Sequence, residues 1–313
     1  MGAPRIAIGP QDTREWVRAA VTAAGGTVVP PERAEGLIWL GTGYGPDPSR
    51  GPAGLRALLH ANPGIRWIQL PFAGVEPFAQ AGVLTGDRVW TAGQGVYARP
   101  VAEHALTLGL AGLRDLGRRI RAADWEPQSG LSLTGARVTI FGGGGIAREL
   151  IRMLAPFECD VTVVRRRPEP VPGAGRTLGF GERYEALKGA DLVVLALALT
   201  PETEGVMGAV EFELMEPHAW LVNVARGKHV VTEDLVVALR ENTIGGAALD
   251  VTDPEPLPAG HPLWELPNCI VTPHTANTEA MGRPLLAMRI NENVQRFAAG
   301  EPLLGLVDPE LGY

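Results

Sequence analysis

Short apolar runs alternate with stretches of helical hydrophobic spacing along almost the whole chain. Residues 5–9 and 36–41 are early examples of such runs, and residues 192–199 form the longest strongly apolar one. Most of these runs end at glycine, proline or polar residues, which are typical of turns. Strands that alternate with helices form parallel sheets whose faces the helices cover. The pattern therefore predicts an α/β fold with parallel sheets.

Two helical stretches indicate how the chain divides into domains. Residues 101–125 carry apolar side chains at helical spacing without a proline, which predicts one long helix. Residues 283–300 form a terminal helix with one apolar face, which needs an apolar surface to cover it. We expect this helix to pack back on the first section and to make that domain discontinuous. The predicted domains are residues 1–95 with 281–313, and residues 96–280.

Composition narrows the class of protein. The chain has 313 residues, enough for two domains of about 150 residues each. Its 28 Lys and Arg against 35 Asp and Glu give a net charge of −7, the wrong sign for a general nucleic-acid binder. The apolar runs fall well short of the roughly 20 residues that a membrane helix needs, and two cysteines form neither a disulfide framework nor a zinc site. With no signal-peptide pattern, we expect a cytoplasmic protein without nucleic-acid, membrane or metal partners.

A glycine-rich turn follows one of the apolar runs and has the form Gly142-x-Gly144-x-x-Ala147. Its first glycine allows a tight turn, its second lets the backbone approach a pyrophosphate, and the small alanine lets helix and strand pack closely. The next residues, Gly145 and Ile146, open a helix whose N-terminus faces the phosphate charge. Because a strand precedes the turn and a helix follows it, the motif predicts a dinucleotide site.

The residues after the next strand bear on the choice between NAD and NADP. NAD sites carry Asp or Glu there, about 20 residues beyond the glycines, to bind the 2′-hydroxyl of the adenosine ribose. This chain has Arg165, Arg166 and Arg167 in that place and no carboxylate at the strand end. Guanidinium groups can hold a 2′-phosphate through bidentate, charge-assisted hydrogen bonds. We therefore predict NADP(H) as the preferred cofactor, with NAD(H) as an alternative.

Three residues with complementary chemistry follow later strands. Arg226, Glu255 and His274 each come after an apolar run, and ligands of open α/β sheets bind outside the carboxyl ends of the strands. An arginine can hold a substrate carboxylate, and a histidine can supply a proton near neutral pH. A glutamate bonded to the imidazole would raise its pKa and fix its orientation. Each residue alone could be an ordinary surface or packing residue, but together they predict reduction of a 2-oxo acid.

A series of motifs in a fixed order resembles the D-isomer-specific 2-hydroxyacid dehydrogenase family. The motifs are FAGVEPF, VAEHAL, FGGGGIA, LTPETEGVMG, LVNVARG and GAALDVTDPEPLPAGHPLWELPNCIVTPHTA, and they extend over nearly the whole chain. The resemblance implies two Rossmann-like domains, of which residues 1–95 with 281–313 bind substrate and residues 96–280 bind dinucleotide. It also implies a homodimer formed by the helix from Val101 and the segment around Trp125.

The resemblance further implies roles for individual residues. Arg226 would bind the substrate carboxylate, His274 would be the acid/base, and Glu255 would be its partner. The other implied contacts are the amides of Ala73 and Gly74 with the carboxylate, Asp250 with the nicotinamide amide, and Thr200 and Ala225 with the cofactor.

The chain departs from the family pattern at two informative positions. Arg165 stands where many NAD-dependent members have Asp, which favours NADP. Tyr97 precedes VAEH, where many members carry an asparagine near the substrate, so a bulkier side chain with a hydroxyl would line the substrate pocket. The histidines other than His274 have no comparable setting, and we assign them, His104 included, to structural or surface roles.

These expectations combine into one function and two alternatives. The function is NADPH-dependent reduction of a small 2-oxo acid, of the glyoxylate or hydroxypyruvate type, to a D-2-hydroxy acid. One alternative is a short phosphoglycerate dehydrogenase, which would need a further cationic site for the substrate phosphate. The other is a dinucleotide-sensing binding protein like the co-repressors that resemble this family, which would show no turnover.

Overall fold

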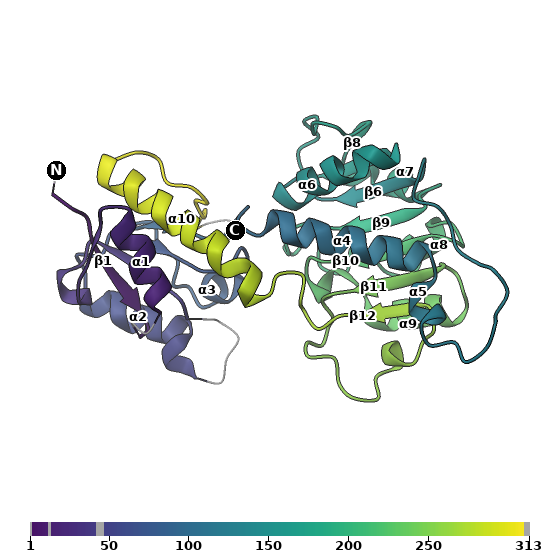
Figure 1. Ribbon diagram of the computed structural model, residues 1–313, viewed down its shortest axis with the longest axis horizontal. Helices are drawn as coiled ribbons and strands as arrows, with labels where there is room; N and C mark the ends of the chain where they lie inside the picture. The colour runs from purple at the N-terminus through teal and green to yellow at the C-terminus, as the bar shows by residue number, and fades with distance from the viewer. Residues whose placement is uncertain (1, 12–13, 42–46, 310–313) are drawn as a thin grey trace. The chain divides into compact units, whose positions relative to one another are not determined.

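The chain forms two compact units in the computed structural model, which describes residues 2–11, 14–41 and 47–309. Unit 1 consists of residues 1–97 and 279–313, and unit 2 consists of residues 98–278 (Figure 1). The domains predicted above from the sequence are residues 1–95 with 281–313, and residues 96–280. Residue 1 and residues 310–313 of the first predicted domain lie outside the described part. Each unit is built around its own parallel sheet.

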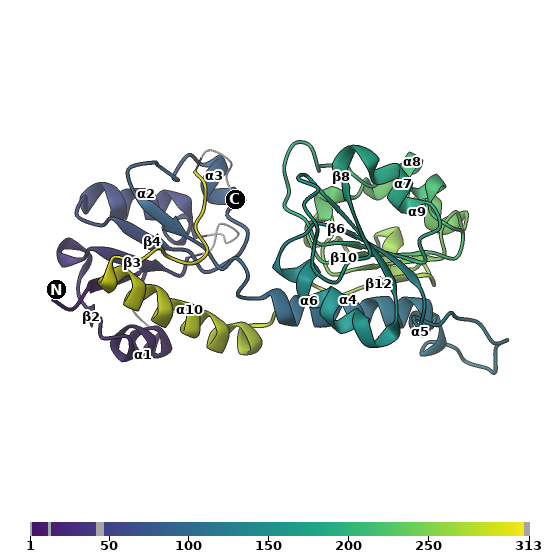
Figure 2. The same ribbon diagram turned by 90° about the horizontal axis from the view of Figure 1, so that it is seen from above.

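A five-stranded sheet in the order β2-β1-β3-β4-β5 forms the centre of unit 1. Its strands are β1 (Arg5–Gly9), β2 (Thr27–Val28), β3 (Gly36–Trp39), β4 (Trp67–Gln69) and β5 (Val89–Thr91). The helices of the unit are α1 (Glu15–Ala23), α2 (Pro52–Ala61), α3 (Glu76–Gln80) and α10 (Glu279–Ala299). Helices α1 and α10 cover one face of the sheet and α2 and α3 cover the other (Figure 2). Strand β3 is buried along its whole length, as expected for a strand covered on both faces.

Helix α10 is attached to the sheet of unit 1 by apolar and polar contacts. Its residues Ile290 and Val294 are fully buried in the same apolar cluster as α1. Asn293, which is also fully buried, donates from Nδ2 to Oε1 of Gln69 at 2.9 Å and accepts from the amide of Leu304 at 2.8 Å. Because a buried amide without partners is costly, these bonds specify where α10 lies on the sheet.

A seven-stranded sheet in the order β12-β11-β10-β9-β6-β7-β8 forms the centre of unit 2. Its strands are β6 (Arg137–Phe141), β7 (Asp160–Arg165), β8 (Arg176–Gly179), β9 (Leu192–Leu195), β10 (Trp220–Asn223), β11 (Gly246–Leu249) and β12 (Cys269–Val271). The helices are α4 (Ala98–Leu113), α5 (Leu116–Arg119), α6 (Gly145–Leu154), α7 (Arg183–Leu187), α8 (Ala209–Leu214) and α9 (Thr232–Arg240). Short 3-10 helices lie at Pro31–Arg33, Pro48–Arg50, Ala155–Phe157, Phe180–Glu182, Gly227–His229 and Pro262–Trp264.

The strand order of unit 2 reverses between β6 and β9. The chain proceeds from β6 to β7 and β8 on one side, then returns to β9 and continues outward to β12. Helices α4 and α6 pack on one face of the sheet, and α7, α8 and α9 pack on the other. This is the doubly wound arrangement whose ligand crevice lies at the reversal point. The predicted α/β class with Rossmann-like parallel sheets is confirmed.

The prediction of one helix over residues 101–125 is wrong. The structure has α4, which ends at Leu113, and the short α5, and Asp115 between them has a left-handed φ of 54°. The carbonyl of Leu113 accepts the amide of Leu131 at 2.6 Å, so a partner distant in sequence replaces the next helical hydrogen bond. Periodicity within 101–125 carries no information about that partner, because helical spacing reports only local preference.

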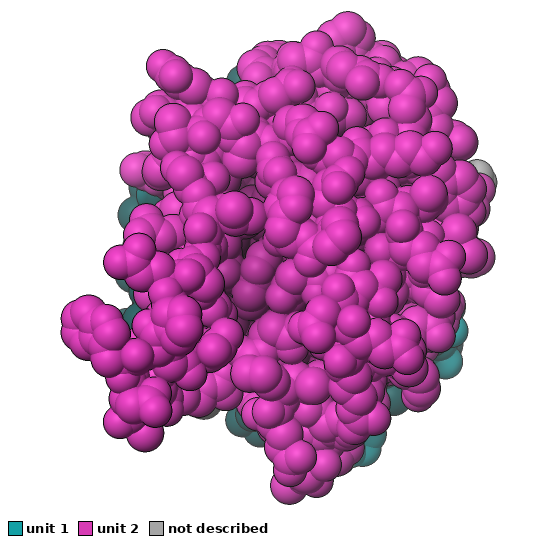
Figure 3. All heavy atoms as spheres, turned by 90° about the vertical axis from the view of Figure 1, so that its right-hand side faces the viewer, with its two compact units in different colours: residues 1–97, 279–313 teal, residues 98–278 magenta. Residues whose placement is uncertain are grey.

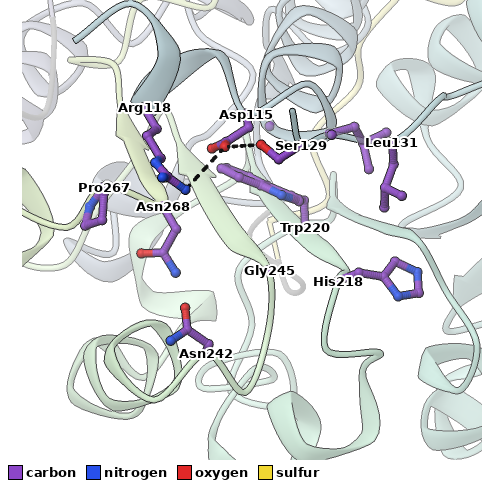
Figure 4. Close-up of a pocket in the computed structure, with 13 residues that line it drawn as sticks. Asp115, Arg118, Ser129, Leu131, His218, Trp220, Asn242, Gly245, Pro267 and Asn268 are labelled. Atoms are coloured by element: carbon purple, nitrogen blue, oxygen red, sulfur yellow. Dashed lines mark hydrogen bonds and ion pairs between the residues drawn. The ribbon is translucent and has the colours of Figure 1, made fainter. Parts of the chain in front are cut away.

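The surface of unit 2 is hollowed at the amino-terminal edge of its sheet (Figures 3 and 4). The hollow in Figure 4 has a volume of about 420 Å³, and its walls include Asp115, Ser129 and Asn268. Trp220, the first residue of β10, lines it, which places the hollow at the edge opposite to the carboxyl ends of the strands. In the described part of the chain, no helix is both apolar and long enough to cross a membrane. Nor do those residues contain a group of three or more His, Cys, Asp or Glu arranged to hold a metal ion.

Candidate active site

Polar residues follow three neighbouring strands of the unit 2 sheet. Arg226 comes three residues after β10, Asp250 directly after β11, and His274 three residues after β12. The three strands are parallel and adjacent, so their carboxyl ends meet at one edge of the sheet. We refer to Arg226, Asp250, Glu255 and His274 as the strand-end cluster.

The turn that carries Arg226 is shaped by the side chain of Asn223. This asparagine is fully buried at the end of β10, accepts the amide of Ala225 at 3.0 Å and donates to the carbonyl of Arg226 at 2.9 Å. A Cβ on Gly227 would collide with the backbone of Thr252, so this position requires glycine. Arg226 itself is half-buried, and its Nη1 donates to the carbonyl of Ala225 at 2.7 Å. Sequence reasoning identified Arg226 but missed Asn223, whose only signal is a polar residue ending an apolar strand.

The structure pairs His274 with Glu255. Nδ1 of His274 lies 2.7 Å from Oε1 of Glu255, and the amide of His274 donates to the carbonyl of Asp250 at 2.8 Å. His274 has a left-handed φ of 51°, which is uncommon for a non-glycine residue and is often found at functional sites. The hydrogen bond to Glu255 raises the pKa of His274, burial opposes this, the charges of Glu255 and Asp250 raise it further, and Arg226 lowers it. The other three members of the strand-end cluster thus all act electrostatically on His274.

Asp250 is the most constrained member of the cluster. Its side chain is 1% exposed, and its Oδ1 accepts from Thr272 Oγ1 at 2.6 Å and from the amide of Thr275 at 2.9 Å. Its Oδ2 accepts from the amide of Ala276 at 3.0 Å. Burial alone would raise the pKa of Asp250, but hydrogen bonds from His104, Thr272 and these two amides outweigh it and bring the pKa to about 2. Asp250 is therefore an anion that holds the chain segment on both sides of His274.

The glycine turn lies at the reversal point of the sheet and fits a dinucleotide pyrophosphate. Gly142 has a left-handed φ of 107°, and a Cβ there would collide with the carbonyl of Ala196 after β9. A Cβ on Gly144 would meet nothing within 4 Å, so the approach to the backbone is open. Helix α6 starts at Gly145 and no side chain caps its N-terminus, which leaves amides for an anion. Ile146 is half-buried in the first turn of this helix.

The arginines after β7 occupy the position that recognises the adenosine ribose in dinucleotide sites. Arg165 ends β7, and its side chain is 25% exposed, whereas Arg166 and Arg167 are exposed. Arg165 Nη2 lies 3.2 Å from a carboxylate oxygen of Glu169, and Nη1 donates to the Glu169 carbonyl at 3.3 Å. Sequence reasoning considered only the strand end and missed this carboxylate four residues further on. We refer to Arg165, Arg166 and Arg167 as the arginine segment.

Thr200 and Ala225, the other residues expected to line the cofactor, lie in turns after β9 and β10. Thr200 is half-buried, and its amide donates to Oγ1 of Thr203 at 2.8 Å in a local turn. Ala225 is buried, at 5% exposure. The fully buried His229 lies beneath the turn after β9, with Nδ1 2.9 Å from the carbonyl of Thr203 and Nε2 3.3 Å from that of Leu197. The side chains of Thr203 and His229 support this turn, which agrees with the structural or surface role assigned to His229 from sequence, whereas Thr203 was missed.

The remaining predicted site residues belong to unit 1. Ala73 is exposed and Gly74 is half-buried in the turn between β4 and α3. Within the described residues, no hydrogen bond uses the amide of Ala73 or Gly74. The hydroxyl of Tyr97 donates to the carbonyl of Pro71 at 2.5 Å, and burial raises the pKa of Tyr97 to about 12. Tyr97 therefore lies against the same turn as a neutral phenol.

Comparison with known proteins identifies the family of this chain. Residues 104–276, more than half of the chain, match the family model for the NAD-binding domain of D-isomer specific 2-hydroxyacid dehydrogenases. The chain belongs to the D-isomer specific 2-hydroxyacid dehydrogenase family. It is therefore an oxidoreductase that uses an NAD(P) cofactor.

Individual relatives of this dehydrogenase agree with that assignment. The glyoxylate/hydroxypyruvate reductase A of Serratia proteamaculans is 35% identical over 61% of this chain, and the match spans 60% of the reductase. A D-isomer specific 2-hydroxyacid dehydrogenase from Xanthobacter autotrophicus Py2, in complex with NADPH and MES, superimposes with a TM-score of 0.84 at 29% identity over the whole of both chains. A probable 2-hydroxyacid dehydrogenase from Rhizobium etli CFN 42, in complex with NADP, HEPES and L(+)-tartaric acid, gives 0.80 at 25% identity over both chains.

Proposed function

We propose that this dehydrogenase catalyses NADPH-dependent reduction of a small 2-oxo acid, of the glyoxylate or hydroxypyruvate type, to a D-2-hydroxy acid. The observation that carries the proposal is the 2.7 Å pair of His274 and Glu255 at the same sheet edge as Arg226. An acid, the group that keeps it protonated and a carboxylate-binding cation are the groups that this reaction needs.

Each of the three residues has a distinct role in the proposed reaction. Arg226 holds the substrate carboxylate through its planar guanidinium and orients the adjacent carbonyl. His274 donates its proton to the carbonyl oxygen as that oxygen becomes a hydroxyl. Glu255 bonds to Nδ1, which leaves Nε2 as the donor and keeps the imidazole protonated through its raised pKa. When bound, the reduced nicotinamide supplies the hydride.

The cofactor assignment rests on the glycine turn and the arginine segment. The open backbone at Gly144 and the uncapped start of α6 suit the pyrophosphate. Arg165 would bind the 2′-phosphate, with Arg166 adding positive charge, and NAD(H) would be used less well. The Xanthobacter and Rhizobium relatives are bound to NADPH and NADP respectively, which supports the same preference here. Thr200, Ala225 and Asp250 would line the nicotinamide end.

The substrate class follows from the cationic site and from relatives. In unit 1, the free amides of Ala73 and Gly74 would bind a carboxylate, and Tyr97 beside that turn would limit the size of the group bound there; in unit 2, Arg226 would bind a carboxylate. The Serratia relative is named as a glyoxylate/hydroxypyruvate reductase, and we propose the same two acids for this chain.

A turnover assay tests this function directly. We expect oxidation of NADPH with glyoxylate and hydroxypyruvate, formation of D-glycerate from the latter, and no oxidation with glycolaldehyde, which lacks the carboxylate. The Arg226→Lys variant lacks the planar guanidinium, so KM for both acids should rise and kcat should fall. Together these two changes should lower kcat/KM by about 10-fold or more. Absence of turnover with every small 2-oxo acid, combined with dinucleotide-dependent assembly, would favour the sensing role instead.

We further propose that the protein acts as a homodimer through the segment after α4. Ile120 is 81% exposed and Trp125 is fully exposed on the same short segment, and exposed apolar side chains that gather in one place can mark a protein–protein contact. Ile120→Ser with Trp125→Ser should shift the protein from dimer to monomer in light scattering. Val237→Ser on α9, which removes another exposed apolar side chain, is the control and should leave the dimer intact. An unchanged mass for the double variant would mean that this segment is not the interface.

A further inference from the structure

His104 contacts the strand-end cluster through Asp250, although the sequence analysis assigned it no functional role. It belongs to α4, and its side chain is only 21% exposed. Its Nε2 lies 3.0 Å from Oγ1 of Thr272 and 3.3 Å from Oδ1 of Asp250. The contact joins a helix near the start of unit 2 to the loop after its last strand, 168 residues later.

The hydrogen bonds around Thr272 determine which atom of His104 carries a proton. Thr272 Oγ1 donates its hydrogen to Asp250 Oδ1 at 2.6 Å, so it has only lone pairs to offer to His104. Both atoms that face Nε2 are therefore acceptors, and Nε2 must carry the hydrogen. His104 is thus a donor to a threonine and a carboxylate that are already bonded to each other.

The Thr272–Asp250 pair in turn holds the segment that carries His274. The carboxylate of Asp250 accepts the amides of Thr275 and Ala276, and its carbonyl accepts the amide of His274. Residues in the left-handed region persist only where the surrounding structure over-determines them. The φ of 51° at His274 is therefore maintained by these bonds on either side of it.

We propose that His104 is a positioning residue for the reaction, because its Nε2–H fixes the Thr272–Asp250 pair and thereby the orientation of His274 toward Glu255. The inference rests on the proposed function in that His274 is taken as the proton donor. Among the described residues, no hydrogen bond or ion pair joins His104 to His274 or Glu255, so its effect is transmitted through Asp250 and the loop.

A positioning role and a packing role for His104 predict different effects of substitution. A packing residue could be replaced by any side chain of similar size, whereas a positioning residue needs the N–H donor. His104→Phe keeps a ring of similar size and removes the donor, and His104→Gln supplies a side-chain N–H that does not titrate. Thr272→Val removes the hydroxyl that links His104 to Asp250 with little change in shape. If His104→Phe fails to fold, Thr272→Val tests the same contact in its place.

The first measurement is the titration of His274 by NMR in protein labelled at the histidine ring carbons, with its signal assigned from His274→Gln. The charged groups that act on this imidazole are Glu255, Asp250 and Arg226. His104→Phe should lower the pKa of His274 measurably below the wild-type value, since the bond to Glu255 is the largest cause of its elevation. His104→Gln should leave it at the wild-type value. His218→Phe, which changes a histidine at the opposite sheet edge, is the control and should have no effect.

The second measurement is steady-state reduction of glyoxylate with NADPH. His104→Phe should lower kcat by about 10-fold, because small misplacements of a catalytic group have large effects, while KM changes by less than about 2-fold. His104→Gln should restore kcat. The double variant with Thr272→Val should be no worse than either single variant, because both act through one contact.

The two measurements distinguish failure of this inference from failure of the proposed function. Unchanged His274 titration and kcat in His104→Phe, or equal losses in His104→Phe and His104→Gln, would overturn the positioning role. A shifted His274 titration in a protein that reduces no 2-oxo acid would retain the positioning role and reject the proposed function.

Discussion

The strand-end cluster and the arginine segment lie in the same unit, yet their side chains are held very differently. Asp250 is almost fully buried and accepts from a threonine, a histidine and two amides, and His274 has both a side-chain and a backbone partner. Among the described residues, the hydrogen-bonding partner of Arg165 is Glu169, whose side chain is itself 60% exposed, and the two arginines that follow Arg165 are exposed. Groups that take part in proton transfer need fixed geometry. A group that recognises a phosphate can adjust to it, because its long side chain and charge tolerate several positions.

The difference predicts large effects for substitutions in the strand-end cluster and smaller ones in the arginine segment. Effects in the cluster should appear in kcat and in the pH profile. Effects in the arginine segment should appear as changes in the preference between the two cofactors, with turnover at saturation largely kept.

Replacing the proposed proton donor should have the largest effect. His274→Ala is expected to lower kcat by about 10²- to 10⁴-fold, because the carbonyl oxygen loses its acid. NADPH binding, followed by fluorescence, should remain. His218→Ala removes a histidine at the opposite sheet edge, where it bonds to Asp191, and should keep full activity. A loss of less than about 3-fold in His274→Ala would remove His274 from the proposed role.

Reversing a charge in the arginine segment should change the cofactor preference. Arg165→Asp removes charge-assisted hydrogen bonds to the 2′-phosphate and offers a carboxylate to a 2′-hydroxyl, so the NADPH/NADH ratio of kcat/KM should fall by about 10- to 100-fold. Lys188→Asp makes the same change of charge at an exposed residue between α7 and β9, at the amino-terminal edge, and should not alter the ratio. An unaltered ratio in Arg165→Asp would mean that other groups read the phosphate.

Removing the charge of Glu255 should move the pH dependence of reduction. The pKa of His274 is raised by Glu255, so the protonated imidazole persists above its usual range, and the rate should fall as pH rises through that elevated pKa. Glu255→Gln lowers the pKa of His274, so the fall should begin at a lower pH, with kcat reduced by about 10-fold near neutral pH. If the rate of Glu255→Gln falls at the same pH as that of the wild type, Glu255 does not set the pKa of the proton donor.

The same comparison explains which parts of the molecule could be predicted from the sequence. Strand β1 matches the expected Arg5–Gly9, and the position of Arg226 and His274 at one sheet edge could be predicted because parallel strands bring their carboxyl ends to one edge. The end of α4 was missed because the carbonyl of Leu113 accepts a hydrogen bond from the distant amide of Leu131 in place of an amide in the next helical turn. The contacts of His104 with Thr272 and Asp250 were missed for a similar reason, since these partners are more than 140 residues away and helical spacing describes only the residues of its own turn.

The smallest expected effect concerns the carboxylate that sequence reasoning overlooked beside the arginine segment. Glu169 lies 3.2 Å from Arg165 and is 60% exposed, and exposed ion pairs contribute about 0–1 kcal/mol. Glu169→Gln frees the guanidinium and removes a negative charge near the expected 2′-phosphate, so KM for NADPH should fall by about 2-fold while KM for NADH stays constant. Glu185→Gln, which removes the partner of Arg176, is the matched control. A rise in KM for NADPH would instead mean that Glu169 orients Arg165, and the arginine segment would then be preorganised in the way the strand-end cluster is.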